Sequence, residues 1–258
     1  MSPAIEIAIR AGAAAAIFAG MALWEWRLPR RKLLAGRRPR WVANLGILAV
    51  DVLAVRLLVP ATAVGVALIA AERGWGLLHL AGVPEWAAII LGVIALDFAI
   101  YVQHVVFHHV PWLWRLHRMH HADLDIDVTT GVRFHPLEIV LSAAIKIAAV
   151  AALGVPTAGV VVFEVLLNAT SMFNHSNVAL PPQIESAVRW LVVTPQMHQV
   201  HHSADRGETD SNFGFSLPWW DRLFGSYRVV PAASERGMTI GLPTFRDVAE
   251  LRIGRLLT

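Results

Sequence analysis

The chain has 258 residues, of which 56% are hydrophobic and only 16% are charged, and its formal net charge is +3. A soluble domain carries about 25% charged residues, so this composition indicates a protein that is embedded in lipid. The chain contains no cysteine, which excludes disulfides, iron–sulfur clusters and thiolate metal sites.

The N-terminal part is predicted to form two membrane spans joined by a basic loop. Residues 4–26 form the first span, which we expect to be retained because no signal-peptide cleavage pattern accompanies it. The second is a tilted span within residues 41–71, whose Asp51 and Arg56 are expected to face protein rather than lipid. The cations of the loop between them are Arg27, Arg30, Arg31, Lys32, Arg37, Arg38 and Arg40. Apolar runs flank this loop, which favours a positive-inside topology signal over nucleic-acid binding, so we expect a cytoplasmic loop and no nucleic-acid partner.

The third apolar run, residues 85–109, carries one polar stripe. At 100° per residue, a single helix face collects Asp97, Tyr101, His104 and His108. Polar residues inside a span usually face the bundle interior and are functional. His109 points about 100° away from His108, so we expect it to be a non-ligand or an outer residue.

A histidine triplet follows this run. His117, His120 and His121 are spaced i, i+3 and i+4, so one helical turn presents all three on one side. The segment ADLDID comes next and is predicted to be a polar loop. It could supply outer hydrogen-bond partners for ligand histidines, or it could be solvated, and both interpretations stay open for Asp123, Asp125 and Asp127.

The long apolar run 137–173 is predicted to be a hairpin of two helices, because Gly154 and Pro156 interrupt it near the middle. In such a hairpin Lys146 and Glu164 reach similar depth, and we expect them to pair because a lone charge there is costly. A second polar stripe then runs down the second helix through Glu164, Asn168, Ser171 and His175.

The second triplet, His198, His201 and His202, repeats the spacing of the first. With the basic loop in the cytoplasm, counting crossings through the hairpin places all the histidine groups on that same side. The turn-rich segment after residue 202 is expected to form a cytoplasmic cap. The predicted fold is therefore all-α: a membrane bundle of about four spans, in a 2+2 pattern with the hairpin after residue 136 and a separate N-terminal span as an option, plus a helical cap carrying the histidines.

The histidine pattern indicates metal. Nine or ten neutral imidazoles could supply two metal ions with four or five ligands each, and imidazole suits iron, zinc, copper and nickel. The sequence has no HExxH motif, no GxGxxG fingerprint and no P-loop, which disfavours a zinc protease or a nucleotide-binding enzyme.

A family resemblance follows from these motifs. The groups His104-x-x-x-His108, His117-x-x-His120-His121 and His198-x-x-His201-His202 resemble the three histidine boxes of the membrane fatty acid hydroxylase and sterol desaturase superfamily. The segments FHPLE (134–138), NHSN (174–177) and ETDSNFGF with WWDRLFGSYR (208–228) are also similar, so the resemblance covers roughly residues 90–228.

The resemblance implies an O2-dependent, non-haem di-iron enzyme that hydroxylates or desaturates an unactivated C–H bond of a membrane lipid, such as a fatty acyl chain, a sterol or an isoprenoid. It implies two iron ions, although zinc or another divalent metal can occupy such a site in a purified sample. The implied ligands are His104, His108, His117, His120, His121, His198, His201 and His202. His175 joins them because a polar stripe ends on it, whereas His135 is expected either to be a ligand or to cap the helix that begins at Pro136. Residues expected to lie in an outer shell or the polar interior are Asp97, Tyr101, Asn174, Glu164 and Asn168.

Electrons are expected to come from a separate donor, a ferredoxin or a b-type cytochrome with its reductase, because no flavin or nicotinamide fingerprint is present. Arg115, Arg118, Arg206 and Arg222 could receive an acidic donor, or could simply be surface residues. We expect one catalytic domain, 1–258, made of N-terminal spans (1–84), a histidine-box region (85–228) and a tail (229–258). The expected location is the bacterial inner membrane, with the boxes facing the cytoplasm. The alternative is a histidine-ligated haem protein or metal-binding membrane protein without oxygenase activity.

Overall fold

A computed structural model of the chain describes residues 3–229, 237–251 and 253–257. Within these residues the chain folds into helices joined by loops, with two isolated β-bridges and no β-strand. The elements are α1 (Pro3–Arg27), α2 (Arg37–Leu58), α3 (Ala63–Arg73), α4 (Leu77–Leu80), α5 (Glu85–His109), α6 (Pro111–His121), η1 (Thr130–Val132), α7 (Pro136–Leu153), α8 (Thr157–Asn174), α9 (Pro182–Val188), α10 (Pro195–His201), α11 (Arg206–Thr209), α12 (Trp219–Phe224), η2 (Val248–Leu251) and α13 (Ile253–Leu256).

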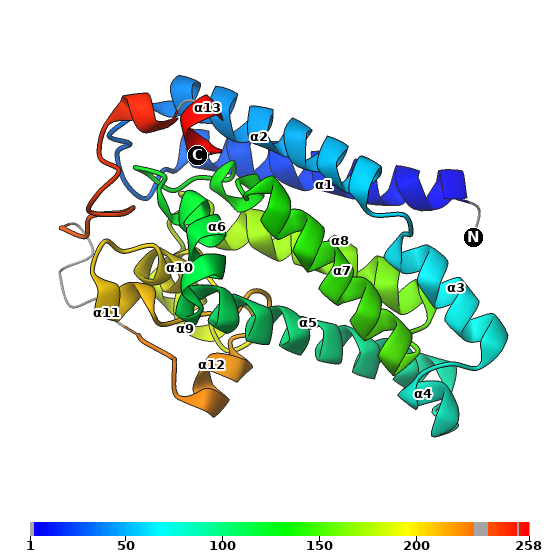
Figure 1. Cartoon of the computed structure of the whole chain (residues 1–258). Coiled ribbons are helices and arrows are strands. Elements are labelled where there is room, and N and C mark those ends of the chain that lie inside the picture. Colours follow the sequence, from blue (N-terminus) through cyan, green and yellow to red (C-terminus); the bar gives the residue numbers. More distant parts are fainter. Residues whose placement is uncertain (1–2, 230–236, 252, 258) are drawn as a thin grey trace.

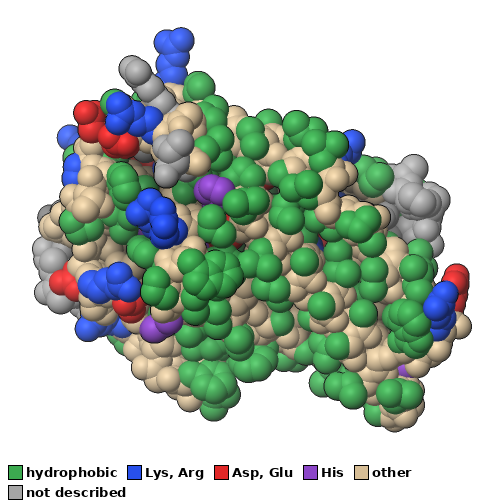
Figure 2. Space-filling model, in the orientation of Figure 1, with side chains coloured by type: hydrophobic (Ala, Val, Ile, Leu, Met, Phe, Trp, Pro, Cys, Tyr) green, Lys and Arg blue, Asp and Glu red, His purple; other side chains and the backbone are tan. Residues whose placement is uncertain are grey.

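The long helices form a bundle with a cap of short helices at one end (Figure 1). In the bundle, α1 and α5 pack on α8, while α2 packs on α7. The short helices α6, α9, α10, α11 and α12 gather at the end opposite to α3 and α4. Figure 2 shows hydrophobic side chains covering the bundle part of one face, with most charged side chains at the capped end. The predicted all-α helical fold is therefore confirmed.

Five segments of the described residues are long and apolar enough to cross a membrane, namely Ile7–Arg27, Arg37–Leu80, Glu85–His109, Pro136–Leu153 and Thr157–Asn174. The predicted tilted helix over 41–71 is wrong in detail. Helix α2 ends at Leu58 and α3 begins at Ala63, because Pro60 has no N–H group and disfavours a helical conformation in the residue before it. Asp51 is buried as expected, but Arg56 is exposed.

The hairpin of α7 and α8 is confirmed. Gly154 ends α7 with φ 70°, a left-handed conformation that favours glycine, and its N–H donates to the Val150 carbonyl at 2.9 Å. The predicted pair is also present: the Lys146 ammonium donates to Glu164. Arg10 of α1 contacts the other oxygen of Glu164 at 2.8 Å, so the carboxylate inside the bundle has two cationic partners.

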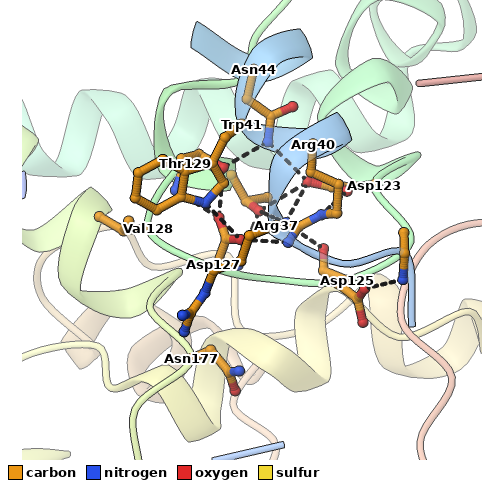
Figure 3. Close-up of polar contacts among 12 residues, drawn as sticks. Arg37, Arg40, Trp41, Asn44, Asp123, Asp125, Asp127, Val128, Thr129 and Asn177 are labelled. Carbon is orange, nitrogen blue, oxygen red and sulfur yellow. Dashed lines mark hydrogen bonds and ion pairs between the residues drawn. The ribbon is translucent and has the colours of Figure 1, made fainter. Parts of the chain in front are cut away.

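The acidic loop differs from both expectations, since its aspartates are buried and contact neither solvent nor histidine. They surround Arg40, which the sequence had suggested was only part of a topology signal (Figure 3). The guanidinium donates to Asp123 at 2.7 and 2.8 Å and also to Asp127, while Asp125 accepts from the Ala35 N–H at 2.9 Å. This network attaches the start of α2 to the loop after the first histidine triplet.

Candidate metal centre

Nine histidine side chains converge where the bundle meets the cap, and each is at most 5% exposed. Histidines three or four positions apart on one helix lie on the same face, so each helix directs its histidines to the same place. Helix α5 supplies two, α6 supplies three, α8 ends on one, and α10 with its C-cap supplies three. They are His104, His108, His117, His120, His121, His175, His198, His201 and His202.

These side chains form two groups, and within each group one nitrogen per ring lies within 4.8 Å of all the others. The two groups touch, since the rings of His121 and His202 stack with centroids 4.4 Å apart. This division matches the expected four or five ligands per ion. The first group is His104, His108, His117, His121 and His201, and the second is His120, His175, His198 and His202.

Backbone carbonyls fix the tautomer of four of these rings. In each case the Nδ1 atom lies 2.7–2.9 Å from a carbonyl oxygen, which can only accept, so Nδ1 carries the proton. The lone pair is then on Nε2, the nitrogen that faces the other histidines. The ring and carbonyl pairs are His104 with Phe213, His120 with Arg133, His175 with Ser171, and His201 with Ser211.

Two carboxylates hold two further rings. Glu138 accepts from His117 Nδ1 at 2.7 Å, and Asp210 lies 3.2 Å from His108 Nδ1. A carboxylate on the far nitrogen of a ligand histidine orients the ring and raises its basicity. Histidine spacing alone predicts neither residue. Glu138 ends the FHPLE segment and Asp210 lies in the ETDSNFGF segment, so those two motifs could have indicated them.

The facing nitrogens fit a bound cation. The Nε2 atoms of His120 and His175 are 3.0 Å apart, and those of His104 and His201 are 3.1 Å apart. In each pair both rings are protonated at Nδ1, so two lone pairs face each other without a proton between them. Two imidazoles bound to one ion at about 2.0–2.1 Å, at a right angle, would place their nitrogens about 2.9 Å apart.

Burial favours the neutral form of five of these rings, which is the form that binds metal. Desolvation, followed by the neighbouring imidazoles, lowers the pKa of His120, His121 and His202 well below its usual value. Burial likewise lowers the pKa of His175 and of His201 to about 3. A set of neutral nitrogen donors suits iron, zinc, copper or nickel, so these residues fit a divalent metal.

The remaining three histidines, His79, His109 and His135, lie outside both groups. His135 is the N-cap of α7, where its Nδ1 accepts from the Leu137 N–H at 3.1 Å. Of its two expected roles, the structure therefore shows the cap and does not bring the ring to the metal groups. His109 is exposed and bonds to the Val105 carbonyl at 2.8 Å, which agrees with its expected exclusion.

The residues expected in an outer shell or in the polar interior form hydrogen bonds with other helices and with the cap. Asp97 accepts from the Trp220 indole at 2.8 Å, and Tyr101 bonds to Ser226 at 3.1 Å, so both attach the cap to α5. Glu164 binds Lys146, as described above. The amide group of Asn168 donates to the Glu164 carbonyl at 2.8 Å, and that of Asn174 donates to the Phe215 carbonyl at 2.8 Å.

A cavity of about 670 Å³ reaches the first group from within the bundle. His104 and His117 form part of its wall, and the apolar side chains around them include Phe107, Phe134 and Phe215. This volume lies within the range of about 300–1,000 Å³ that is typical of small-molecule sites. The cavity therefore has room for a small molecule beside His104 and His117.

Several known proteins are similar in sequence to part of this chain. Ornithine lipid hydroxylase OlsE of Rhizobium tropici is 26% identical over 157 residues, which are 61% of this chain and 46% of the relative. Human alkylglycerol monooxygenase is 29% identical over 168 residues, or 63% of this chain and 35% of the relative. Very-long-chain aldehyde decarbonylase GL1-4 of Oryza sativa is 26% identical over 186 residues, which are 60% of this chain and 29% of the relative.

The chain thus spans less than half the length of these curated relatives. No solved structure matches it. The model of the family described as "Fatty acid hydroxylase" matches residues 89–226, more than half of the chain and nearly the range over which the motifs resemble that family. The chain belongs to the fatty acid hydroxylase family.

Proposed function

We propose that this protein is a di-iron membrane oxygenase that uses O2 to hydroxylate or desaturate an unactivated C–H bond of a lipid. The observation that carries the proposal is the pair of adjacent, buried, all-histidine groups beside an apolar cavity. Two relatives support the chemistry by name, one as an ornithine lipid hydroxylase and one as an alkylglycerol monooxygenase.

In this proposal each histidine group holds one iron ion, and the nine residues assigned as ligands are those of the two groups. When bound and reduced, iron supplies the activation of O2 that oxidation of an unreactive C–H bond requires. Glu138 and Asp210 keep His117 and His108 in their ligand orientation. Burial of all nine rings excludes bulk water from the place where the lipid is oxidised.

Electrons come from a separate protein, a ferredoxin or a b-type cytochrome with its reductase. We propose that it docks over Trp114. Trp114 is half-buried, its ring lies 4.9 Å from that of His108 and 5.4 Å from that of His121, and the guanidinium of Arg206 covers it. Exposed Arg115 and Arg206 give this region a positive charge that would attract an acidic donor. We place this face in the cytoplasm and the bundle in the bacterial inner membrane.

The test is anaerobic reconstitution of the full-length protein with ferrous iron, followed by O2, a chemical reductant and a panel of membrane lipids. Mass spectrometry should detect lipids that have gained one oxygen atom or lost two hydrogen atoms. His108→Ala should abolish the product and lower the iron content. His109→Ala should do neither, because the His109 ring is exposed and lies outside both histidine groups. Absence of any oxidised lipid across a broad panel would refute the proposal.

A further inference from the structure

Two backbone carbonyls of the cap hold rings of the first histidine group. The Ser211 carbonyl accepts from His201 Nδ1 on α10 at 2.8 Å, and the Phe213 carbonyl accepts from His104 Nδ1 on α5 at 2.7 Å. The residue between them is Asn212. A single residue thus separates two carbonyls that fix the tautomers of histidines on two different helices.

The backbone of Asn212 is left-handed, with φ 50°, and no other residue apart from glycine has a positive φ in the described part of the chain. An L side chain disfavours this conformation, although asparagine tolerates it better than most residues. Rotation about this φ turns the peptide group that carries the Ser211 carbonyl relative to the segment that carries the Phe213 carbonyl. The conformation of Asn212 therefore decides whether both carbonyls meet their rings at once.

The side chain of Asn212 holds this conformation. Its amide nitrogen donates to the Met197 carbonyl at 3.0 Å and to the Arg228 carbonyl at 2.9 Å, and its amide oxygen accepts from the Arg228 N–H at 2.8 Å. The residue is fully buried, so water does not replace these bonds. Met197 lies on α10, so the side chain also ties the loop to the helix that carries His201.

The rings of the second histidine group bond to other segments. The Arg133 carbonyl accepts from His120, and the Ser171 carbonyl accepts from His175. A change at Asn212 should therefore affect the first group and spare the second. This selectivity separates a positioning role from a general contribution to stability.

We propose that Asn212 is a positioning residue for the metal ion of the first histidine group, and that it acts by directing the carbonyls of its two neighbours at His104 and His201. These carbonyls keep the proton on Nδ1 and the Nε2 lone pair toward the ion. Without them either ring could rotate or change tautomer, which would weaken metal binding. The inference rests on the proposed function for its metal centre and does not require lipid oxidation.

Equilibrium zinc binding to the full-length protein in detergent, in competition with chelators, tests the inference. Imidazole binds zinc, and zinc undergoes no redox reaction. The unmodified protein should bind two ions. Asn212→Ala should bind one with unchanged affinity and the other about 10–100-fold more weakly. Asn212→Gly loses the same side-chain bonds but adopts the left-handed conformation without penalty, so it should bind the weakened ion at least about fivefold more tightly than Asn212→Ala does.

Asn177→Ala is the matched control. Asn177 is also buried, and its side chain makes the same two bonds with one distant residue, accepting from the Arg31 N–H at 3.1 Å and donating to the Arg31 carbonyl at 2.8 Å. Its own carbonyl accepts from the Arg30 N–H at 2.9 Å, and its φ is not positive. Asn177→Ala should lower the thermal unfolding midpoint comparably while it leaves both zinc affinities unchanged.

Two backgrounds assign the weakened ion. When His108 and His121 are both replaced by alanine, the first group is depleted, and adding Asn212→Ala should not change the affinity of the remaining tight ion. When His120 and His175 are replaced instead, adding Asn212→Ala should weaken the remaining ion about 10–100-fold.

Equal weakening of both ions in Asn212→Ala, no weakening of either, or the same loss in Asn177→Ala would overturn the inference alone. If Asn212→Ala does not fold, Asn212→Gly decides by the same criterion, since its first ion should still be bound more than threefold more weakly than in the unmodified protein. Fewer than two zinc ions on the unmodified protein would overturn both the inference and the two-metal centre. Selective loss of one ion, without lipid oxidation by the iron-loaded protein, would refute the oxygenase proposal alone.

Discussion

Replacing Arg40 by methionine should destabilise the protein severely, although the residue lies more than sixty positions before the first ligand histidine. Its side chain is fully buried and makes five hydrogen bonds, to both oxygens of Asp123, to the Asp127 carboxylate, to the Asp125 carbonyl and to the Thr130 hydroxyl. Methionine keeps the length of the side chain but removes every donor, so two buried carboxylates lose their cation.

Removing one partner of a buried ion pair costs about 3–5 kcal/mol, because the remaining charge has neither water nor a counterion. Asn44 still donates to Asp123 at 3.2 Å and Trp41 to Asp127 at 3.3 Å, but neither neutralises a charge. For a domain of this size the loss corresponds to a decrease of about 6–20 °C in the midpoint of thermal unfolding. Thermal unfolding in detergent, followed by intrinsic tryptophan fluorescence, measures it.

Arg38→Met is the control, because Arg38 belongs to the same basic run but is exposed. If the run were only a topology signal, the two substitutions would have the same effect. We expect Arg38→Met to leave the unfolding midpoint nearly unchanged. Equal midpoints for the two variants would refute the assignment of a structural role to Arg40.

The pH dependence gives a second check. Burial raises the pKa of Asp123, but attraction and hydrogen bonds from Arg40 outweigh burial and hold that pKa well below its usual value. A depressed folded-state pKa contributes stability above the unfolded value of about 3.9, and this contribution is lost as the pH falls below it. The difference in midpoint between the unmodified protein and Arg40→Met should therefore narrow below about pH 4.

Three further predictions concern the histidines. Glu138→Gln should lower metal affinity about 10–100-fold in competition with a chelator, because His117 loses its anionic partner; unchanged affinity would argue against the orienting role. His135→Asn should leave the metal content unchanged, measured by elemental analysis, since the structure uses this ring as a helix cap; loss of metal would instead favour a ligand role. Stability of the metal-free protein should fall as the pH decreases from about 6.5, because the pKa values of His175 and His201 are about 3 in the folded state and ordinary in the unfolded state. Denaturant titrations in chelator between pH 7.5 and 5.5 measure this slope, and a flat profile would contradict it.

The parts of the fold and site that the sequence predicted are those set by local spacing. The triplets at His117–His121 and His198–His202 converge because i, i+3 and i+4 positions share a helix face. The α7–α8 hairpin follows from a glycine and a proline near the middle of one apolar run, and its length brings Lys146 and Glu164 together. In each case the interacting residues lie on one helix or on two helices joined by a short turn.

The features that were missed depend on contacts between distant segments. Arg40 and Asp123 are 83 positions apart, and His108 and Asp210 are 102 apart, so no periodicity relates them. A run of cations beside a span is ordinarily explained as a topology signal. That explanation gave no reason to expect that Arg40, one of these cations, is buried. The division of α2 from α3 was visible as Pro60, but the hydropathy of the surrounding residues is continuous across it.

The Arg40 network also determines which segment of the chain can fold independently. The family match begins at residue 89, yet the loop it contains has its counterion on α2, and the cavity leading to the histidines has α1 and α2 as walls. A fragment cut at that boundary would carry every histidine motif, but Asp123 and Asp127 would lack the Arg40 cation and the cavity would be open along one side. The border that homology recognises is therefore not the border of the cooperative unit, and α1 and α2 belong to that unit as much as the histidine triplets do.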